Sequence, residues 1–289
     1  MKNIPQYSIG IVALMALLII VFSSCRKEKQ DTLLDRDTNS LIEYAMTDHA
    51  FNDVAGITDE AYDGSLQTYR TGSPMSGSTV SACATVSFDT LSSPKSLTID
   101  FGTTDCLCGD GNYRRGKIIV TWSGAYRDSG SSHAITFDDY FVNYNQLTGT
   151  KTVTNNGTNA LGQPVFSVTV NGSVIWDPQY FGGGGTSTMV STRTRVWTAG
   201  YNTPFIWLDD IYQISGTATG TTRTGNSYTM NTASPLVKEI GFRHFTNGVL
   251  EFTPGNLPTR SIDYGYVNGL RDNLAKVTIA GQSFTVTLR

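Results

Sequence analysis

The chain has 289 residues, of which 39% are hydrophobic, and its 21 Lys and Arg against 24 Asp and Glu give a net charge of −3. A chain of this length can bury one large core or two small ones. Because it has no basic stripe, nucleic acid is excluded as an expected partner.

The first 25 residues have the parts of an export signal. Lys2 supplies a positive charge, residues 9–22 form an unbroken apolar run, and two serines precede Cys25. The apolar run is shorter than the roughly 20 residues that span a bilayer, so a cleaved signal is favoured over a membrane anchor. The junction resembles the bacterial lipoprotein box, with Phe22 where Leu is usual.

The resemblance implies that residues 1–24 are a signal peptide and that Cys25 becomes the lipidated N-terminus. Two or more acyl chains anchor a protein stably, so we expect lipid anchoring in the cell outer membrane, on its periplasmic or its surface side. Residues 25–38 are charged and without a core-forming period, which is typical of a flexible tether.

Residues 39–80 are expected to form a helical segment and a connector. The helical spacing of apolar residues predicts an amphipathic helix over about 40–62 that covers a face or end of a sheet. Its apolar stripe consists of Ile42, Met46, Ala50, Val54, Ile57 and Ala61. The polar residues that fall largely off this stripe are Asp48, Asn52, Asp53 and Asp59.

From residue 81 the pattern changes to alternation with period two, which predicts an all-β body over 81–289. We expect an antiparallel sandwich or elongated meander of many short strands. Residues 98–102 and 261–265 echo each other, which suggests a division of the body into two similar sub-units, about 81–160 and 161–289. The expected strands are 85–88, 96–101, 117–122, 134–137, 141–143, 147–154, 165–176, 189–198, 211–222, 227–231, 248–253, 260–264, 275–279 and 282–288.

Turn chemistry is expected between these strands, because Asn and Gly tolerate positive φ. The segments concerned are Asn155-Asn156-Gly157, Asn171-Gly172, Thr224-Gly225-Asn226, Asn247-Gly248 and Ala280-Gly281.

Three cysteines remain beyond the lipidation site, and disulfides persist in the compartment to which export leads. We predict one disulfide from Cys83 to either Cys106 or Cys108. The spacing of the last two is too short for a zinc knuckle, and the three histidines are scattered. The sequence therefore indicates no metal site and no cofactor.

Eight short segments of the β-rich part carry a family likeness: residues 83–86, 99–102, 116–121, 148–154, 207–210, 234–236, 262–265 and 272–273. Together they resemble a group of uncharacterised lipoproteins of Bacteroidetes. The resemblance covers about residues 80–289 and implies an all-β body and an envelope location, but no activity. Members often carry a second pair of cysteines near the positions of Phe242 and Arg271, which this chain lacks.

The most enzyme-like features are Asp138-Asp139 and Asp209-Asp210, because paired carboxylates serve acid–base chemistry in glycosidases. Each pair precedes a strand, which is equally typical of turn caps or a solvent-facing edge. No nucleophile elbow, phosphate loop or catalytic triad accompanies them. No catalytic residue is assigned.

Five aromatic residues are candidates for a sugar-stacking platform, but they are equally suited to the core of a sheet. They are Trp122, Trp176, Trp197, Trp207 and Tyr201.

The sequence thus predicts a lipid-anchored, non-enzymatic envelope protein with a structural role or with a protein or glycan partner. The alternative is a glycan-binding module or an accessory to carbohydrate processing. A glycosidase that uses paired Asp residues comes third.

Overall fold

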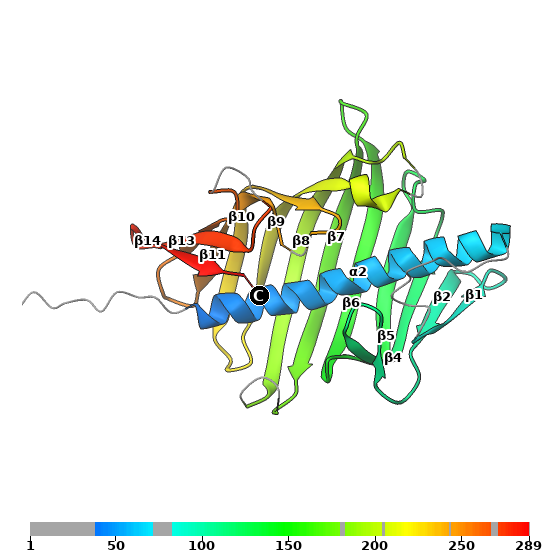
Figure 1. Cartoon of the computed structure of the whole chain (residues 1–289), viewed down its shortest axis with the longest axis horizontal. Coiled ribbons are helices and arrows are strands. Elements are labelled where there is room, and N and C mark those ends of the chain that lie inside the picture. The colour runs from blue at the N-terminus through cyan, green and yellow to red at the C-terminus, as the bar shows by residue number, and fades with distance from the viewer. Residues whose placement is uncertain are drawn as a thin grey trace, which may run out of the picture. The chain divides into compact units, whose positions relative to one another are not determined.

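The computed structural model describes residues 38–71, 83–179, 183–203, 206–242, 244–266 and 271–288. These residues form one antiparallel sheet of fourteen strands with one long helix across it (Figure 1). The predicted all-β class is confirmed. The arrangement is the expected meander, in a single sheet, and not a sandwich of two sheets.

Strands that follow each other in the chain are neighbours in the sheet, with one exception. β2 and β3 are not neighbours, and both pair with β4. The sheet continues through the β6–β7 hairpin, where the boundary between two sub-units was expected. The strands are β1 (Thr85–Asp89), β2 (Lys95–Asp100), β3 (Cys106–Leu107), β4 (Tyr113–Trp122), β5 (Ser132–Val142), β6 (Asn145–Thr158), β7 (Pro164–Trp176), β8 (Gly185–Ala199), β9 (Ile211–Thr221), β10 (Ser227–Glu239), β11 (Asn247–Pro254), β12 (Arg260–Asp263), β13 (Leu274–Ile279) and β14 (Gln282–Thr287).

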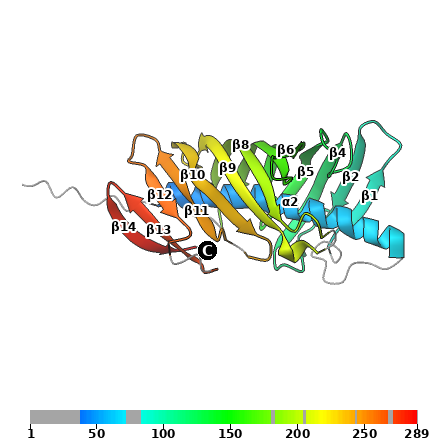
Figure 2. The ribbon, with the colours of Figure 1, turned by 90° about the horizontal axis from the view of Figure 1, so that it is seen from above.

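Helix α2 (Asn39–Thr71) crosses one face of the sheet at a steep angle to the strands (Figures 1 and 2). Its predicted role as a cover for the sheet is confirmed, although it extends beyond residue 62. The hydrophobic core lies between helix and sheet. The helix contributes Tyr44, Phe51, Val54, Ile57 and Ala61 to it.

The buried stripe of α2 is partly polar, and the predicted apolar stripe is wrong at Ile42, although Met46 and Ala50 pack against the core as expected. Ile42 is 49% exposed, whereas Glu43, Thr47 and Asp48 are buried. A buried charge needs a partner of opposite sign. The sheet supplies such partners at this end of the helix, so burial there follows charge rather than hydrophobicity.

The predicted turn at Asn171-Gly172 is also wrong, because both residues lie inside β7. A Cβ on Gly172 would lie 2.4 Å from Cζ of Phe51 and 2.7 Å from the Thr148 carbonyl oxygen. Gly172 therefore permits the close approach of the helix to the sheet. By contrast, Ala280-Gly281 forms the expected β13–β14 turn, with both residues at positive φ.

The other expected turns divide between loops and strands. Thr224-Gly225-Asn226 lies in the connection from β9 to β10, as predicted. Asn155-Asn156-Gly157 lies instead within β6, next to an irregularity in its pairing with β7. Asn247-Gly248 begins β11.

The disulfide joins Cys83 to Cys106, which confirms the predicted bond and decides its partner. Cys108 is a free thiol, buried in the core beside the helix. Burial raises the pKa of this thiol, which keeps it protonated and unreactive near neutral pH. Of the two candidate partners for Cys83, only Cys106, which pairs with β4, is partly exposed to solvent.

A second, smaller cluster, here called the end cluster, lies at the end of the sheet where β6 meets β7. Its buried residues are Val153, Phe166 and Trp197. Tyr126 stacks on Phe166, with ring centroids 5.1 Å apart. The end cluster is separate from the core beneath α2, and it packs against the part of the sheet that lies beyond the helix.

Candidate binding surface

The two faces of the central strands differ sharply in charge. The basic side chains of β6 and β8 all point to the helix side, where Lys151 and Arg193 are buried and Arg195 is partly buried. Arg193 donates to both oxygens of Asp48, at 2.6 and 3.1 Å, and to the Tyr44 hydroxyl at 2.9 Å. This pair holds α2 against β8.

Similar contacts hold the middle of the helix, at Phe51 and Asp53. Lys151 Nζ donates to the Phe51 carbonyl oxygen at 2.8 Å. On β4, Arg114 pairs with Asp53 of the helix at 2.8 Å and with Asp110 at 2.6 Å. Burial by itself raises the pKa of Asp110, but hydrogen bonds from Arg114 and Asn112 outweigh it and lower the pKa to about 2.

Sequence reasoning missed these contacts, although part of the signal is visible in the strands. The alternation along the strands places Lys151 and Arg193 on the core side. They share that side with buried apolar residues such as Leu147 and Met189. A charged residue at a core position predicts an opposite charge on whatever covers the sheet. Asp48 of α2 is that partner for Arg193, whereas Lys151 donates to the backbone carbonyl of Phe51 and to the side chain of Asn52.

The opposite side of the same strands, here called the open face, carries no charged side chain from β6 through the first half of β10. Exposed protein surface is ordinarily rich in Lys, Arg, Glu and Asp, and threonine dominates here instead. The open face comprises Gln146, Thr148, Thr150, Thr152, Thr154, Val165, Ser167, Thr169, Asn171, Ser173, Ile175, Thr186, Thr188, Val190, Thr192, Thr194, Val196, Gln213, Ser215, Thr217, Thr219, Thr221, Ser227, Thr229 and Asn231.

Strand pairing brings these hydroxyl groups into rows that run across the strands. One row passes through Thr152, Thr169, Thr192, Thr217 and Asn231 as directly paired neighbours. Adjacent strands lie about 4.8 Å apart. The row therefore forms a track of closely spaced hydroxyl groups that continues through the Asn231 amide to Glu251 on β11.

A shallow groove of about 320 Å³ lies on the same side, at the β11 end of the row. Two paired rows line it: Thr217 with Asn231 and Glu251, and Thr219 with Thr229 and Thr253. Thr259 also lines it, and its hydroxyl lies 2.8 Å from that of Thr253. Among the described residues that line this groove, only Glu251 carries a carboxylate.

The aromatic residues of the expected sugar platform do not gather on the open face. Trp176 is buried beneath the helix, where its Nε1 donates to Ser187, which donates in turn to Glu43. Trp122 is half-buried and stacks on His133.

The remaining platform candidates lie elsewhere or outside the description. Trp197 is buried in the end cluster. Tyr201 packs at the border of this cluster, and the centroids of the Tyr201 and Trp197 rings are 6.5 Å apart. The side chain of Trp207 lies outside the described part, although its backbone belongs to the short helix η1 (Trp207–Asp209).

The two aspartate pairs lie at opposite ends of the sheet. Asp138 and Asp139 are exposed near the β5–β6 hairpin, whereas Asp209 and Asp210 lie between β8 and β9, at the end where β6 meets β7. The two pairs therefore cannot act on one substrate bond.

The carboxylate of Asp210 is held by hydrogen bonds from two aromatic side chains. Its carboxylate accepts hydrogen bonds from Trp197 Nε1 at 3.1 Å and from the Tyr212 hydroxyl at 3.3 Å. Burial raises the pKa of Asp210, against these hydrogen bonds, which lower it. The contacts tie the β8–β9 connection to the end cluster.

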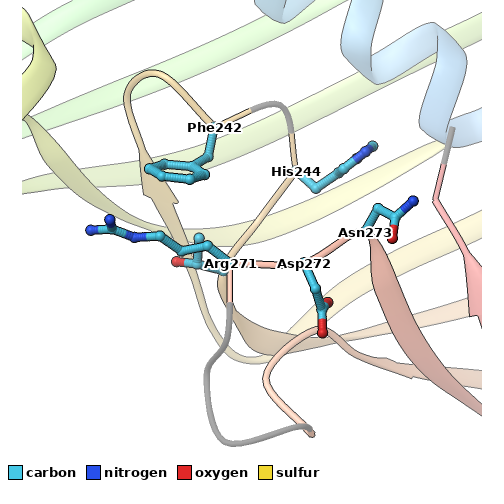
Figure 3. A pocket seen from close by; sticks show the side chains of 6 residues that line it. Phe242, His244, Arg271, Asp272 and Asn273 are labelled. Carbon is cyan, nitrogen blue, oxygen red and sulfur yellow. The ribbon is translucent and has the colours of Figure 1, made fainter.

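A second pocket, of about 330 Å³, is lined by Phe242, His244, Arg271, Asp272 and Asn273, with Thr246 (Figure 3). Arg271 pairs with Glu239 at 2.5 Å, and its guanidinium lies 4.4 Å from the centre of the Phe242 ring. Residues 243 and 267–270, which adjoin the pocket in sequence, lie outside the description, and we assign it no function.

No group of His, Cys, Asp and Glu residues in the described ranges could hold a metal ion. Within the same ranges, α2 is not apolar enough to cross a bilayer. Cys25, the expected lipidation site, and the apolar run before it lie outside the described residues.

Comparisons with protein-family models, with curated proteins and with solved structures found no match to this chain.

Proposed function

We propose that this chain is a lipid-anchored protein of the cell envelope that acts by binding and not by catalysis, and that the open face is its ligand-binding surface. The signal-like N-terminus and the resemblance at Cys25 support the anchored location. The observation that carries the binding role is the segregation of charge between the two faces of the sheet.

That segregation is opposite to what solubility alone favours. Burying Arg193 and Lys151 costs desolvation energy, which their hydrogen bonds with α2 offset. Meanwhile Thr169, Thr192 and Asn171 leave the exposed surface uncharged. A wide uncharged surface suits contact with a partner, because no charge must be desolvated on binding.

Catalysis is not favoured by the geometry. The two aspartate pairs are separated by the length of the strands, and Asp210 is engaged by Trp197 and Tyr212. Neither pair presents two facing carboxylates, which a glycosidase requires.

The proposal is tested by placing one positive charge on the open face. The full-length protein is purified in detergent and co-sedimented with washed envelopes from cells that lack it. Thr192→Arg should reduce the bound fraction severalfold, because a buried unpaired charge disfavours contact. Ala45→Arg, on the exposed side of α2, adds the same charge elsewhere and should bind like the wild type. Equal binding by all three proteins would contradict the proposal.

A further inference from the structure

We infer that the groove between β9 and β11 is a subsite for one residue of an uncharged oligosaccharide, whose chain continues along the adjoining row of hydroxyl groups. This inference rests on the proposed function and names the ligand class of the same surface.

The first support is the chemistry of the groove. A threonine hydroxyl donates one hydrogen bond and accepts two, an amide does both, and a carboxylate accepts. Apart from the backbone pairing of their strands, the side chains of Thr217, Thr219, Thr229, Asn231 and Glu251 form no hydrogen bond or ion pair with the described residues. They are thus available to a ligand that carries many hydroxyl groups, each able to donate and to accept.

The second support is charge. Glu251 and the absence of any basic residue among those lining the groove disfavour phosphate, sulfate and uronic acid groups. The nearest basic residue further along the open face is Lys276 on β13, and it pairs with Asp263 at 3.6 Å. The groove therefore selects neutral sugars over acidic ones.

The third support is geometry. The groove volume of about 320 Å³ lies at the lower end of the range for small-molecule sites, which begins near 300 Å³. The row Thr192–Thr217–Asn231–Glu251 crosses four strands in register. A linear oligosaccharide that lies across the strands meets the groove and then successive hydroxyl groups.

No aromatic ring lines the groove, so stacking does not contribute and affinity for a short oligosaccharide should be weak. We expect a Kd on the order of 1 mM. Repeated contacts along the row raise the apparent affinity for a polymer, as multivalency does in general.

The test titrates the full-length protein in detergent with laminarihexaose, mannohexaose and xylohexaose, and with tetragalacturonate as the acidic probe, by NMR saturation transfer and calorimetry. The double variant Asn231→Leu/Glu251→Gln removes two polar groups and should weaken binding about tenfold. The control Thr98→Val changes the same side of the sheet at β2, far from the groove, and should bind like the wild type. A thermal unfolding curve checks that each variant is folded.

Binding of at least one neutral probe that is weakened only by the groove variant supports the inference. Failure of all neutral probes, equal binding of tetragalacturonate, or equal loss in Thr98→Val overturns it. Concentration-dependent dimerisation that the groove variant abolishes would also overturn it, because a second copy would then be the occupant. In each of these cases the envelope experiment with Thr192→Arg still decides the proposed function independently.

Discussion

At the scale of single residues, the buried ion pairs distinguish this protein from an ordinary helix-covered sheet. Arg193 and Asp48 are both buried, and their side chains are joined by two hydrogen bonds. Such a pair contributes little net stability relative to apolar side chains of similar size, but breaking it leaves one unpaired buried charge. Its main consequence here is to set the position of α2 along the sheet.

Arg193→Met should destabilise the fold by about 3–5 kcal/mol, because Asp48 stays buried without its partner. The double variant Arg193→Met/Asp48→Leu should recover much of this loss, because no buried charge remains. Urea unfolding measures both. Lys276→Met, which breaks the partly exposed pair with Asp263, should cost less than about 1 kcal/mol. Similar losses in both single variants would contradict the prediction.

Asp110 makes a prediction about acid. Its pKa in the folded protein is about 2, below the roughly 3.9 of an unfolded chain. The stabilisation by its charge is therefore complete above about pH 4 and lost as the pH falls towards 2. In Asp110→Asn the decrease of unfolding free energy between these pH values should be less steep than in the wild type, as measured by urea midpoints. Parallel pH profiles would show that Asp110 has no such role.

At the scale of elements, α2 and the central strands are matched in shape as well as in charge. Phe51 has no exposed surface and lies directly over Gly172 of β7. The residue without a side chain thus allows the Phe51 ring to reach the backbone of the sheet. The alternation of residues along the sequence does not reveal this close approach, because Gly172 remains part of the strand and only lacks a side chain.

Gly172→Ala should destabilise the protein by about 1–3 kcal/mol, because the added Cβ overlaps Phe51 and the Thr148 carbonyl. Gly124→Ala is the matched control, since a Cβ there would make only ordinary contacts, 3.4 Å from Ser131 at the closest. Thermal or urea unfolding compares the two. A larger loss for Gly124→Ala would show that the approach of Phe51 is not limiting.

At the scale of the whole molecule, the sheet has one face covered by α2 and one face that no described element covers. The end cluster and the core beneath the helix lie on the covered side. We propose that the other face binds extended polymers at the cell envelope, and that residues 25–38 act as the tether that joins this body to the membrane.

Lipidation is tested on whole cells. Metabolic labelling with a palmitate analogue should tag the wild-type protein and not Cys25→Ala, because acylation requires the Cys25 thiol. Protease treatment of intact cells then distinguishes the surface from the periplasmic side. Equal labelling of both proteins, or of neither, would contradict the lipid anchor.

The sequence by itself determined most of the strands and their type, because alternation and turn chemistry are local properties. The predicted strands 165–176 and 282–288 lie within a residue of β7 and β14, whereas β5 was predicted as two strands, β10 was predicted to end at residue 231 and β3 was missed. The role of the helix as a cover followed from its amphipathic pattern. The disulfide was predicted to one of two partners.

Only the tertiary structure decided which residues of α2 are buried and what remains outside. Asp48 and Arg193 are 145 residues apart in the chain, Glu43 and Ser187 are 144 apart, and Asp53 and Arg114 are 61 apart. No local pattern links such residues, because their burial depends on the partner that folding brings to each. The uncharged open face likewise emerges only when strand pairing aligns threonines from five strands into one surface.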